Sequence, residues 1–250
     1  LRYPEVVKPM FCPVCASNQQ TLSGSKDGYE LYRCGACQLL YVFPMPGDET
    51  LTAFYDGYHK TRQYRAKLAS KVRRAKNRIG RLRSQVRGRD FLDVGCNAGF
   101  AVEAARKLGF VAQGIDIDAA TTAEASKLFP ECQFSTISVQ DLAATGKQFD
   151  LIYCSEVIEH LTVLDDFLVA LAKLMKRDSA LYMTTPDVGH FTLNKPFRQE
   201  PLISWDGIRP PEHLFYFAKG NMKRLLDKHG FTRVKFQWSL QPTLKMVVRR

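Results

Sequence analysis

The sequence predicts an α/β fold in which helices cover both faces of a mostly parallel sheet, preceded by a small separate segment. Three observations indicate this fold. Short apolar runs alternate with helical patterns from about residue 88 onward, a glycine-containing turn joins the first run to the first helix, and an acidic residue ends the second run. The length of 250 residues allows one full-sized domain and a small appendage.

The predicted elements follow one another in the order of a doubly wound sheet. Short, mostly apolar runs bounded by polar or turn residues predict strands at 91–94, 111–115, 133–137, 149–154 and 180–185, then an antiparallel pair at 233–239 and 244–248. Helical periodicity predicts helices at 101–108 and 221–229, the second of them ending before Gly230. Ligands of such sheets bind beyond the carboxyl ends of the strands.

The segment from Asp93 to Gly99 forms the predicted turn between the first strand and its helix. Gly95 and Gly99 permit positive φ angles there, and Asn97 tolerates them better than most residues do. The second strand ends at Asp116, where a carboxylate can accept both ribose hydroxyls of an adenosine. Asp93 would repel a pyrophosphate, whereas S-adenosylmethionine brings an ammonium group and a sulfonium. The sequence therefore favours S-adenosylmethionine as the cofactor, although a glycine turn alone can also be an ordinary connection.

This turn resembles motif I of the class I S-adenosylmethionine-dependent methyltransferases, with Asn97 where that family usually has its middle glycine. The run from Ser155 to Leu161 resembles the segment after strand four in many small-molecule methyltransferases. The resemblance implies a Rossmann-like, seven-stranded methyltransferase sheet over about residues 88 to 250. The residues expected to bind the cofactor are Tyr58, Asp93, Gly95, Cys96, Asn97, Gly99, Phe100, Asp116, Ile117, Ser138, Ser155 and Glu156.

Two cysteine pairs, Cys12 with Cys15 and Cys34 with Cys37, have the spacing of a four-thiolate zinc ribbon. Four thiolates leave zinc no open position, so the expected Zn²⁺ is structural. A disulfide pair or free thiols are the alternative, but nothing resembling a secretory signal precedes the cysteines. The remaining cysteines are expected in the core: Cys96, Cys132 and Cys154.

Residues 60–89 hold 13 of the chain's 36 basic residues and no acidic residue, so the formal net charge of +11 belongs to this segment. Apolar residues recur at steps of three and four from Leu68 to Val86, which predicts a helix that docks by one narrow apolar seam. Its charged face has three explanations: a solvated helix, a surface for RNA or another polyanion, or contact with acidic membrane or an acidic carrier. The lack of interleaved aromatic residues weighs against nucleic acid.

The long irregular stretch at 187–218 is the expected acceptor loop, because such stretches in compact domains usually carry function. Its run from Pro210 to Phe217 resembles the Glu-His-Leu-x-Tyr-Phe segment of the zinc-containing sugar C-methyltransferases, but departs from it in the residues before the Glu-His pair. This resemblance implies that Glu212 and His213 lie beside the acceptor, where a neutral imidazole could take a proton. The candidate catalytic residues are His213, Glu212 and His160, and each histidine could instead only frame the pocket or satisfy the core.

The expected activity is methyl transfer (EC 2.1.1) to a small hydroxylated or keto substrate, such as a sugar or nucleotide sugar. The alternatives are an RNA methyltransferase that holds its substrate with the ribbon and residues 60–89, and a non-catalytic cofactor-binding scaffold. We expect a zinc ribbon at 1–45, a basic helical linker or lid at 46–87 and the methyltransferase domain at 88–250. No apolar run is long enough to cross a bilayer, and a cytoplasmic location would keep the thiols reduced.

Overall fold

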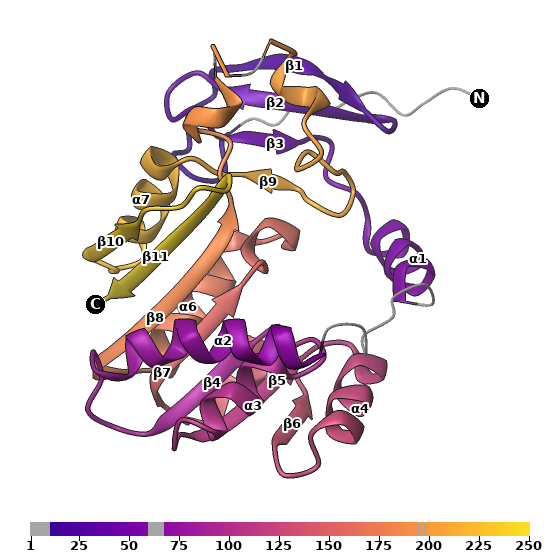
Figure 1. The fold of residues 1–250 in the computed structure, drawn as a ribbon. Helices are drawn as coiled ribbons and strands as arrows, with labels where there is room; N and C mark the ends of the chain where they lie inside the picture. The colour runs from indigo at the N-terminus through magenta and orange to yellow at the C-terminus, as the bar shows by residue number, and fades with distance from the viewer. Residues whose placement is uncertain (1–10, 60–67, 195, 198) are drawn as a thin grey trace.

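The computed structural model describes residues 11–59, 68–194, 196, 197 and 199–250, with the side chains of 48 and 55–59 outside the description. The described strands form two sheets, a small antiparallel one and a seven-stranded mixed one (Figure 1). Figure 1 shows the small sheet lying beyond one end of the strands of the large sheet. Helix α1 (Asp48–His59) lies to one side, on the path between them.

The large sheet has the strand order β10-β11-β8-β7-β4-β5-β6. Parallel pairing joins β4 to both β5 and β7, whereas β11 runs antiparallel to β8 and to β10. The predicted seven-stranded α/β fold is confirmed, although β8 starts earlier than the predicted 180–185. The strands are β4 (Asp90–Val94), β5 (Val111–Asp116), β6 (Gln133–Thr136), β7 (Phe149–Ser155), β8 (Met175–Pro186), β10 (Arg233–Gln237) and β11 (Thr243–Arg249).

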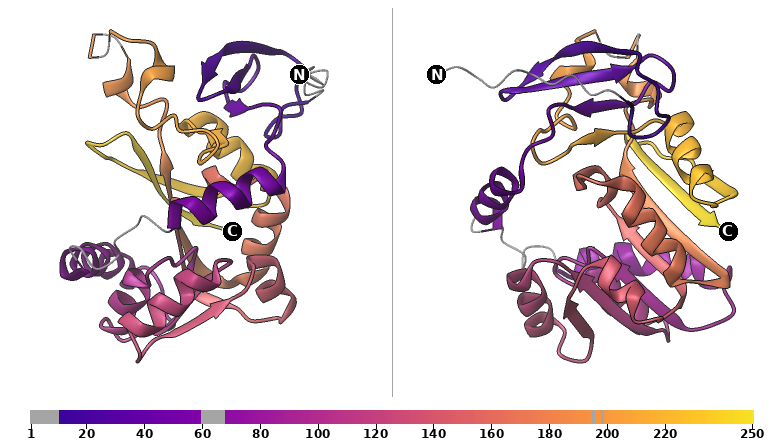
Figure 2. Two further views of the ribbon diagram at one scale, coloured as in Figure 1. Left: turned by 90° about the vertical axis from the view of Figure 1, so that its right-hand side faces the viewer. Right: turned by 180° about the vertical axis from the view of Figure 1, so that it is seen from behind.

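Helices cover both faces of this sheet, as the views in Figure 2 show. Successive residues of β4 point to opposite faces. Phe91 packs in the cluster that contains Ile79, whereas Leu92 packs in the cluster that contains Leu168. The sheet is therefore doubly wound. The helices are α2 (Leu68–Arg83), α3 (Phe100–Arg106), α4 (Ala119–Leu128), α5 (Val139–Ala144), α6 (Leu164–Leu174) and α7 (Lys219–Lys228), with the short turn η1 (Ile158–His160) after β7.

The small sheet combines amino-terminal strands with one strand from the far end of the chain. Its order is β1 (Gln20–Lys26), β2 (Tyr29–Cys34), β3 (Leu40–Val42) and β9 (Phe215–Tyr216). Residues 187–218, predicted as one irregular stretch, thus contain a buried strand as well as the turns η2 (Phe191–Leu193) and η3 (Leu202–Ser204). The local pattern missed β9 because its hydrogen-bonding partner, β3, lies far away in the sequence. One hydrophobic core runs from this sheet into the large one.

Helix α2 docks as its apolar periodicity predicts. Val72, Ile79 and Leu82 are buried against α3 and the sheet, and Val86 is buried just after the helix ends. Part of its basic face is also engaged, because Arg78 Nη1 donates a 2.6 Å hydrogen bond to the hydroxyl of Tyr153. The first residues of the basic segment, 60–67, lie outside the described part of the chain. Among the helices that the structure describes, none is both long and apolar enough to cross a membrane.

Candidate functional site

The turn after β4 has the strained backbone that its residues predict. Gly95, Asn97 and Gly99 adopt φ angles of 70°, 48° and 77°. A side chain at Gly95 would place its Cβ 2.6 Å from Val157, and one at Gly99 would meet Phe134 at 2.5 Å. Glycine is therefore required at both positions, since other residues would be strained and would also clash. The close approach at Gly95 brings the turn after β4 against the segment after β7.

Two carboxylates stand at this turn. Asp116 accepts hydrogen bonds from the backbone N–H of Asn97 at 3.0 Å and of Asp118 at 3.1 Å, so its orientation is fixed at the end of β5. Asp93 is buried, with 4 % of its surface exposed. Burial and the nearby charge of Asp116 raise the pKa of Asp93 well above its ordinary value. A cationic ligand would relieve this repulsion, whereas an anionic one would increase it.

The segment after β7 adds polar groups to the same edge of the sheet. Ser155 Oγ lies 2.7 Å from Thr184 Oγ1, and Thr184 Oγ1 donates to Glu156 Oε1 at 2.7 Å. Glu156 has a φ of 57°, which turns the chain sharply out of the strand, and its side chain is exposed. Because β7 pairs with β4 in parallel, Ser155 and Glu156 lie at the strand edge that also carries Asp93. The sequence reasoning did not single out Thr184.

The remaining predicted cofactor residues are placed as follows. Cys96 is buried, and Phe100 is half-buried in α3 with Lys71 Nζ 4.7 Å from its ring centroid. Ile117 is 80 % exposed directly after β5. Ser138 caps α5 by accepting from the backbone N–H of Asp141 at 3.0 Å. The side chain of Tyr58 lies outside the described residues.

The three candidate catalytic residues come together. His160 belongs to η1 after β7, and its ring centroid lies 4.8 Å from that of His213, which lies two residues before β9. His160 Nδ1 lies 2.6 Å from the carbonyl oxygen of Glu212. The Glu212 carboxylate pairs with Arg209 Nη1 at 3.3 Å. The structure thus joins one predicted residue from the segment after β7 with two from the 187–218 stretch.

His213 is enclosed, with only 2 % of its surface exposed. Its Nδ1 lies 3.1 Å from the carbonyl oxygen of Gly207, and Arg209 Nη2 lies 3.1 Å from its Nε2. Burial, with the charges of His160 and Arg209, lowers the pKa of His213 to about 3. The imidazole is therefore neutral near pH 7 and only weakly basic in this arrangement. A stronger base would require the ring to become less buried, in addition to the charges of His160 and Arg209 moving away.

Glu159 is the functional candidate that the sequence reasoning missed. It has no exposed surface, Thr185 Oγ1 donates to its Oε2 at 2.9 Å, and its Oε1 has no hydrogen-bond partner. Burial and the charge of Glu156 raise its pKa well above the ordinary value. The available signal was a glutamate directly before His160 in the segment that follows β7. The backbone N–H of Leu214 donates to the Glu159 carbonyl at 2.7 Å, which joins η1 to the segment before β9.

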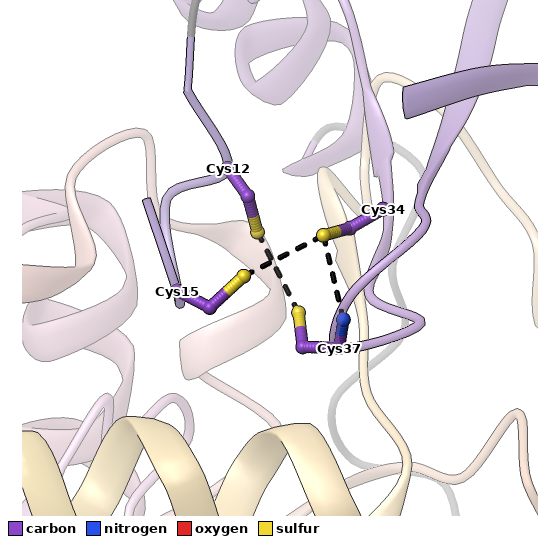
Figure 3. Close-up of side chains that lie close together, drawn as sticks. All are labelled: Cys12, Cys15, Cys34 and Cys37. Atoms are coloured by element: carbon purple, nitrogen blue, oxygen red, sulfur yellow. Dashed lines mark hydrogen bonds between the residues drawn. The ribbon is translucent and has the colours of Figure 1, made fainter. Parts of the chain in front are cut away.

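The four amino-terminal cysteines form the second cluster (Figure 3). Cys12 Sγ lies 3.6 Å from Cys37 Sγ, and Cys15 Sγ lies 3.5 Å from Cys34 Sγ. These separations are too long for disulfide bonds and close to those between the sulfurs of a tetrahedral zinc site. The backbone N–H of Cys37 points at Cys34 Sγ at 3.5 Å. The four sulfurs can therefore act as ligands of one metal ion.

The electrostatics of this cluster also fit a cation. A hydrogen bond from Cys37 lowers the pKa of Cys12 to about 5, and the same contact, with burial, raises the pKa of Cys37. The thiols thus compete, since ionising one makes it harder to ionise the next. A divalent ion at the centre would remove that competition and allow all four to bind as thiolates.

The methyltransferase domain family matches residues 61–235, which include the acid-bearing turn and the histidine cluster. The chain belongs to this family. The family assignment and the seven-stranded sheet together identify a class I S-adenosylmethionine-dependent methyltransferase domain. The match ends before β11 and begins after the cysteine cluster, so that cluster is an addition to the family's common part.

Curated relatives that resemble this domain are ubiquinone biosynthesis O-methyltransferases. That of Bartonella quintana is 27 % identical over 154 residues, which cover 56 % of this chain and 59 % of the relative. That of Bartonella tribocorum is 30 % identical over 154 residues, with the same coverage of both chains. The chain thus spans about three fifths of the length of these relatives.

Solved structures with the same fold act on varied acceptors. Magnesium protoporphyrin IX methyltransferase from Synechocystis has a TM-score of 0.57 at 17 % identity and covers 81 % of this chain and 100 % of its own. A Burkholderia thailandensis 1,6-didemethyltoxoflavin-N1-methyltransferase has a TM-score of 0.58 at 16 % identity and covers 91 % of this chain and 97 % of its own. At these identities the likeness defines the fold, and the acceptor must be argued from the site itself.

Proposed function

We propose that this protein transfers the methyl group of S-adenosylmethionine to a small hydroxylated or keto acceptor, such as a sugar or nucleotide sugar. The observation that carries the proposal is that two kinds of chemical groups lie at one edge of the sheet. Asp93 in β4 and Asp116 at the end of β5 suit a cationic adenosine cofactor, and a histidine cluster follows β7, whose Val157 approaches the turn at Gly95. Brought together, these groups can hold donor and acceptor in one crevice.

The proposed cofactor contacts follow from the geometry of the turn. Asp116 would accept the ribose hydroxyls, because two backbone hydrogen bonds already aim its carboxylate. The exposed side chain of Ile117 would pack on the adenine ring, with Ser138 near its edge. Asp93 would lie on the side of the ammonium and sulfonium groups, whose charge matches its own. This arrangement explains why a buried carboxylate is kept in an apolar sheet.

The acceptor would bind beside His160, Glu212 and His213. In the reaction the bond from sulfur to the methyl carbon breaks while the acceptor oxygen or carbon forms a new bond to it, and the acceptor loses a proton. An in-line approach requires the acceptor to be held rigidly, which the buried His213 before β9 and the partly buried His160 in η1 can support. The likeness to O-methyltransferases of a small molecule supports a hydroxyl acceptor.

The proposal is tested by screening hydroxylated and keto acceptors with isotopically labelled S-adenosylmethionine. We expect label to appear in a small acceptor and calorimetry to show cofactor binding. His213→Ala should lower the turnover number by about a hundredfold while leaving cofactor affinity nearly unchanged, because His213 lies on the acceptor side. Equal turnover in both proteins at saturating acceptor would remove His213 from the reaction. Transfer of label to RNA alone would support the RNA methyltransferase alternative instead.

A further inference from the structure

A three-residue cluster at the acceptor side has the composition of a cation site. Glu159 and His160 come from η1, and His213 comes from the segment that enters β9. Their ligand atoms all lie within 4.8 Å of one another, and His160 Nε2 lies 4.0 Å from Glu159 Oε1. Two imidazoles and one carboxylate, on two separate segments, could therefore close on one ion.

Both imidazoles are already held in the orientation that metal binding needs. The Nδ1 of His160 meets the carbonyl oxygen of Glu212, and the Nδ1 of His213 meets that of Gly207. Because a carbonyl oxygen can only accept, each Nδ1 carries the proton and each Nε2 keeps its lone pair. Histidine ligands of metals usually donate their other ring N–H to a carbonyl or carboxylate in this way.

The carboxylate supplies an independent observation. Glu159 Oε1 is fully buried without a hydrogen-bond partner, although Oε2 accepts from Thr185. A buried polar atom in this state is costly unless something binds it, and a cation would do so. The carboxyl group of Glu156 is close enough to interact with that of Glu159, and it could contribute a fourth ligand.

We propose that Glu159, His160 and His213 bind one divalent first-row cation, such as Zn²⁺ or Mn²⁺. Imidazole nitrogen with carboxylate oxygen suits these ions, and three protein ligands leave positions open for an acceptor oxygen. In this structure the guanidinium group of Arg209 lies next to the cluster, with its Nη2 3.1 Å from His213 Nε2. The Arg209 side chain is 49 % exposed, so it can turn outward when an ion binds.

This inference rests on the proposed function in one respect, which is the purpose of the ion. A bound divalent cation would supply Lewis acidity that helps an acceptor hydroxyl to lose its proton. Glu159, His160 and His213 would hold the ion, and Glu212 would keep His160 in its orientation through its backbone carbonyl. The site would then favour acceptors that offer an oxygen to the ion, such as a hydroxyl beside a second hydroxyl or a keto group.

The experiment titrates Co²⁺ into protein that carries one equivalent of zinc per chain, which the four thiolates bind in preference to the nitrogen and oxygen ligands. We expect one Co²⁺ to bind with the absorption of a nitrogen and oxygen site and without the intense thiolate charge-transfer band. Glu159→Gln and His160→Ala should each weaken this binding by about tenfold to a hundredfold or more. Arg209→Gln should strengthen it, because the competing guanidinium is removed. His229→Ala is the matched control, since His229 is a mostly buried histidine that pairs with Asp165 elsewhere.

Co²⁺ binding that is absent from the wild type, or equally tight in Glu159→Gln, would overturn the inference. Thermal unfolding of the metal-free proteins shows whether the variants are folded. Glu159→Gln should unfold at the same temperature as the wild type or a higher one. If the cation site exists but the proposed function is wrong, Co²⁺ will bind while no small acceptor receives a methyl group. Methyl transfer that persists without any Co²⁺ binding would reject the cation site alone.

Discussion

The carboxylate of Asp116 is held in place by two backbone hydrogen bonds. Asp116 Oδ2 accepts from the backbone N–H of Asn97 in the turn after β4, and Oδ1 accepts from that of Asp118 after β5, so two hydrogen bonds hold the carboxylate at the turn. Burial raises its pKa, which a ligand that donates hydrogen bonds to the carboxylate would counteract. At the scale of the single residue, the site therefore contains a preorganised acceptor for a hydroxyl-bearing ligand.

Replacing Asp116 by Asn should weaken S-adenosylmethionine binding by about 1.5–3 kcal/mol, the usual contribution of hydrogen bonds to a charged group. The amide keeps the shape and one accepting oxygen, so the fold should persist. Isothermal titration calorimetry measures the effect. Asp118→Asn is the control, since Asp118 caps α4 and asparagine caps helices equally well. Unchanged affinity in Asp116→Asn would show that the ribose lies elsewhere.

Glu103 offers a pH prediction away from the site. Burial alone would raise the pKa of Glu103, but hydrogen bonds from Arg106 and Lys107 lower it to about 2. A depressed carboxylate pKa stabilises the fold above the ordinary value of 4.5, and this contribution disappears as the pH falls from 4.5 towards 2.

Glu103→Gln should therefore lower the free energy of unfolding near neutral pH by about 1 kcal/mol, because the partners are partly exposed. The difference from wild type should shrink as the pH falls through that window. Urea unfolding at several pH values measures it. Glu131→Gln, which removes an exposed partner of Arg106, should have a smaller effect. A difference that grows on acidification would contradict the assigned ion pairs.

At the scale of elements, helix α2 shows how one sequence pattern serves two surfaces. Its apolar seam is buried against α3 and the sheet, while Arg73, Arg74, Lys76 and Arg81 are exposed. The sequence predicted the seam because helical spacing alone defines it. It could not predict that Arg78 turns inward to Tyr153, or that Arg83 lies 5.1 Å from the ring centroid of Phe110, because those partners come from other elements.

Ile79→Ala should destabilise the protein by about 2–4 kcal/mol, since it leaves a cavity at a fully buried position of the seam. Arg73→Glu with Arg74→Glu should change the free energy of unfolding by only about 0.5 kcal/mol or less for each site, as expected of exposed positions. Chemical denaturation of both variants provides the comparison. If the double charge reversal destabilised the fold as much as Ile79→Ala, the outward face would be a packing surface.

At the scale of the whole molecule, the cysteine-bearing sheet is tied to the candidate acceptor site. The backbone N–H of Val42 donates to the carbonyl of Leu214, and the N–H of Leu214 donates to that of Glu159. Asn221 Nδ2 also donates to the carbonyl of Cys37 at 3.3 Å, which links α7 to the cysteine cluster. Order in the small sheet thus supports the position of His213 and Glu159.

Metal analysis should find about one zinc ion per chain at the cysteine cluster, and Cys34→Ser should release it. Loss of zinc should disorder the small sheet, which increases hydrogen exchange in residues 11–45. Turnover should fall with it, whereas S-adenosylmethionine affinity should remain, because Asp93 and Asp116 belong to the large sheet. Cys132→Ser is the control at a half-buried cysteine outside the cluster. Full zinc content in Cys34→Ser would disprove the four-thiolate assignment.

The sequence by itself determined the features that depend on neighbouring residues. Strand and helix periods defined the seven-stranded sheet, the order of Asp93, Gly95 and Gly99 defined the turn, and paired cysteines defined the candidate metal cluster. Only the tertiary structure decided what β9 pairs with, how Glu159 is buried and which ring nitrogens of His160 and His213 face a carbonyl oxygen. The reason is physical, because strand pairing, burial and tautomer choice depend on atoms that lie far apart along the chain and meet only after folding.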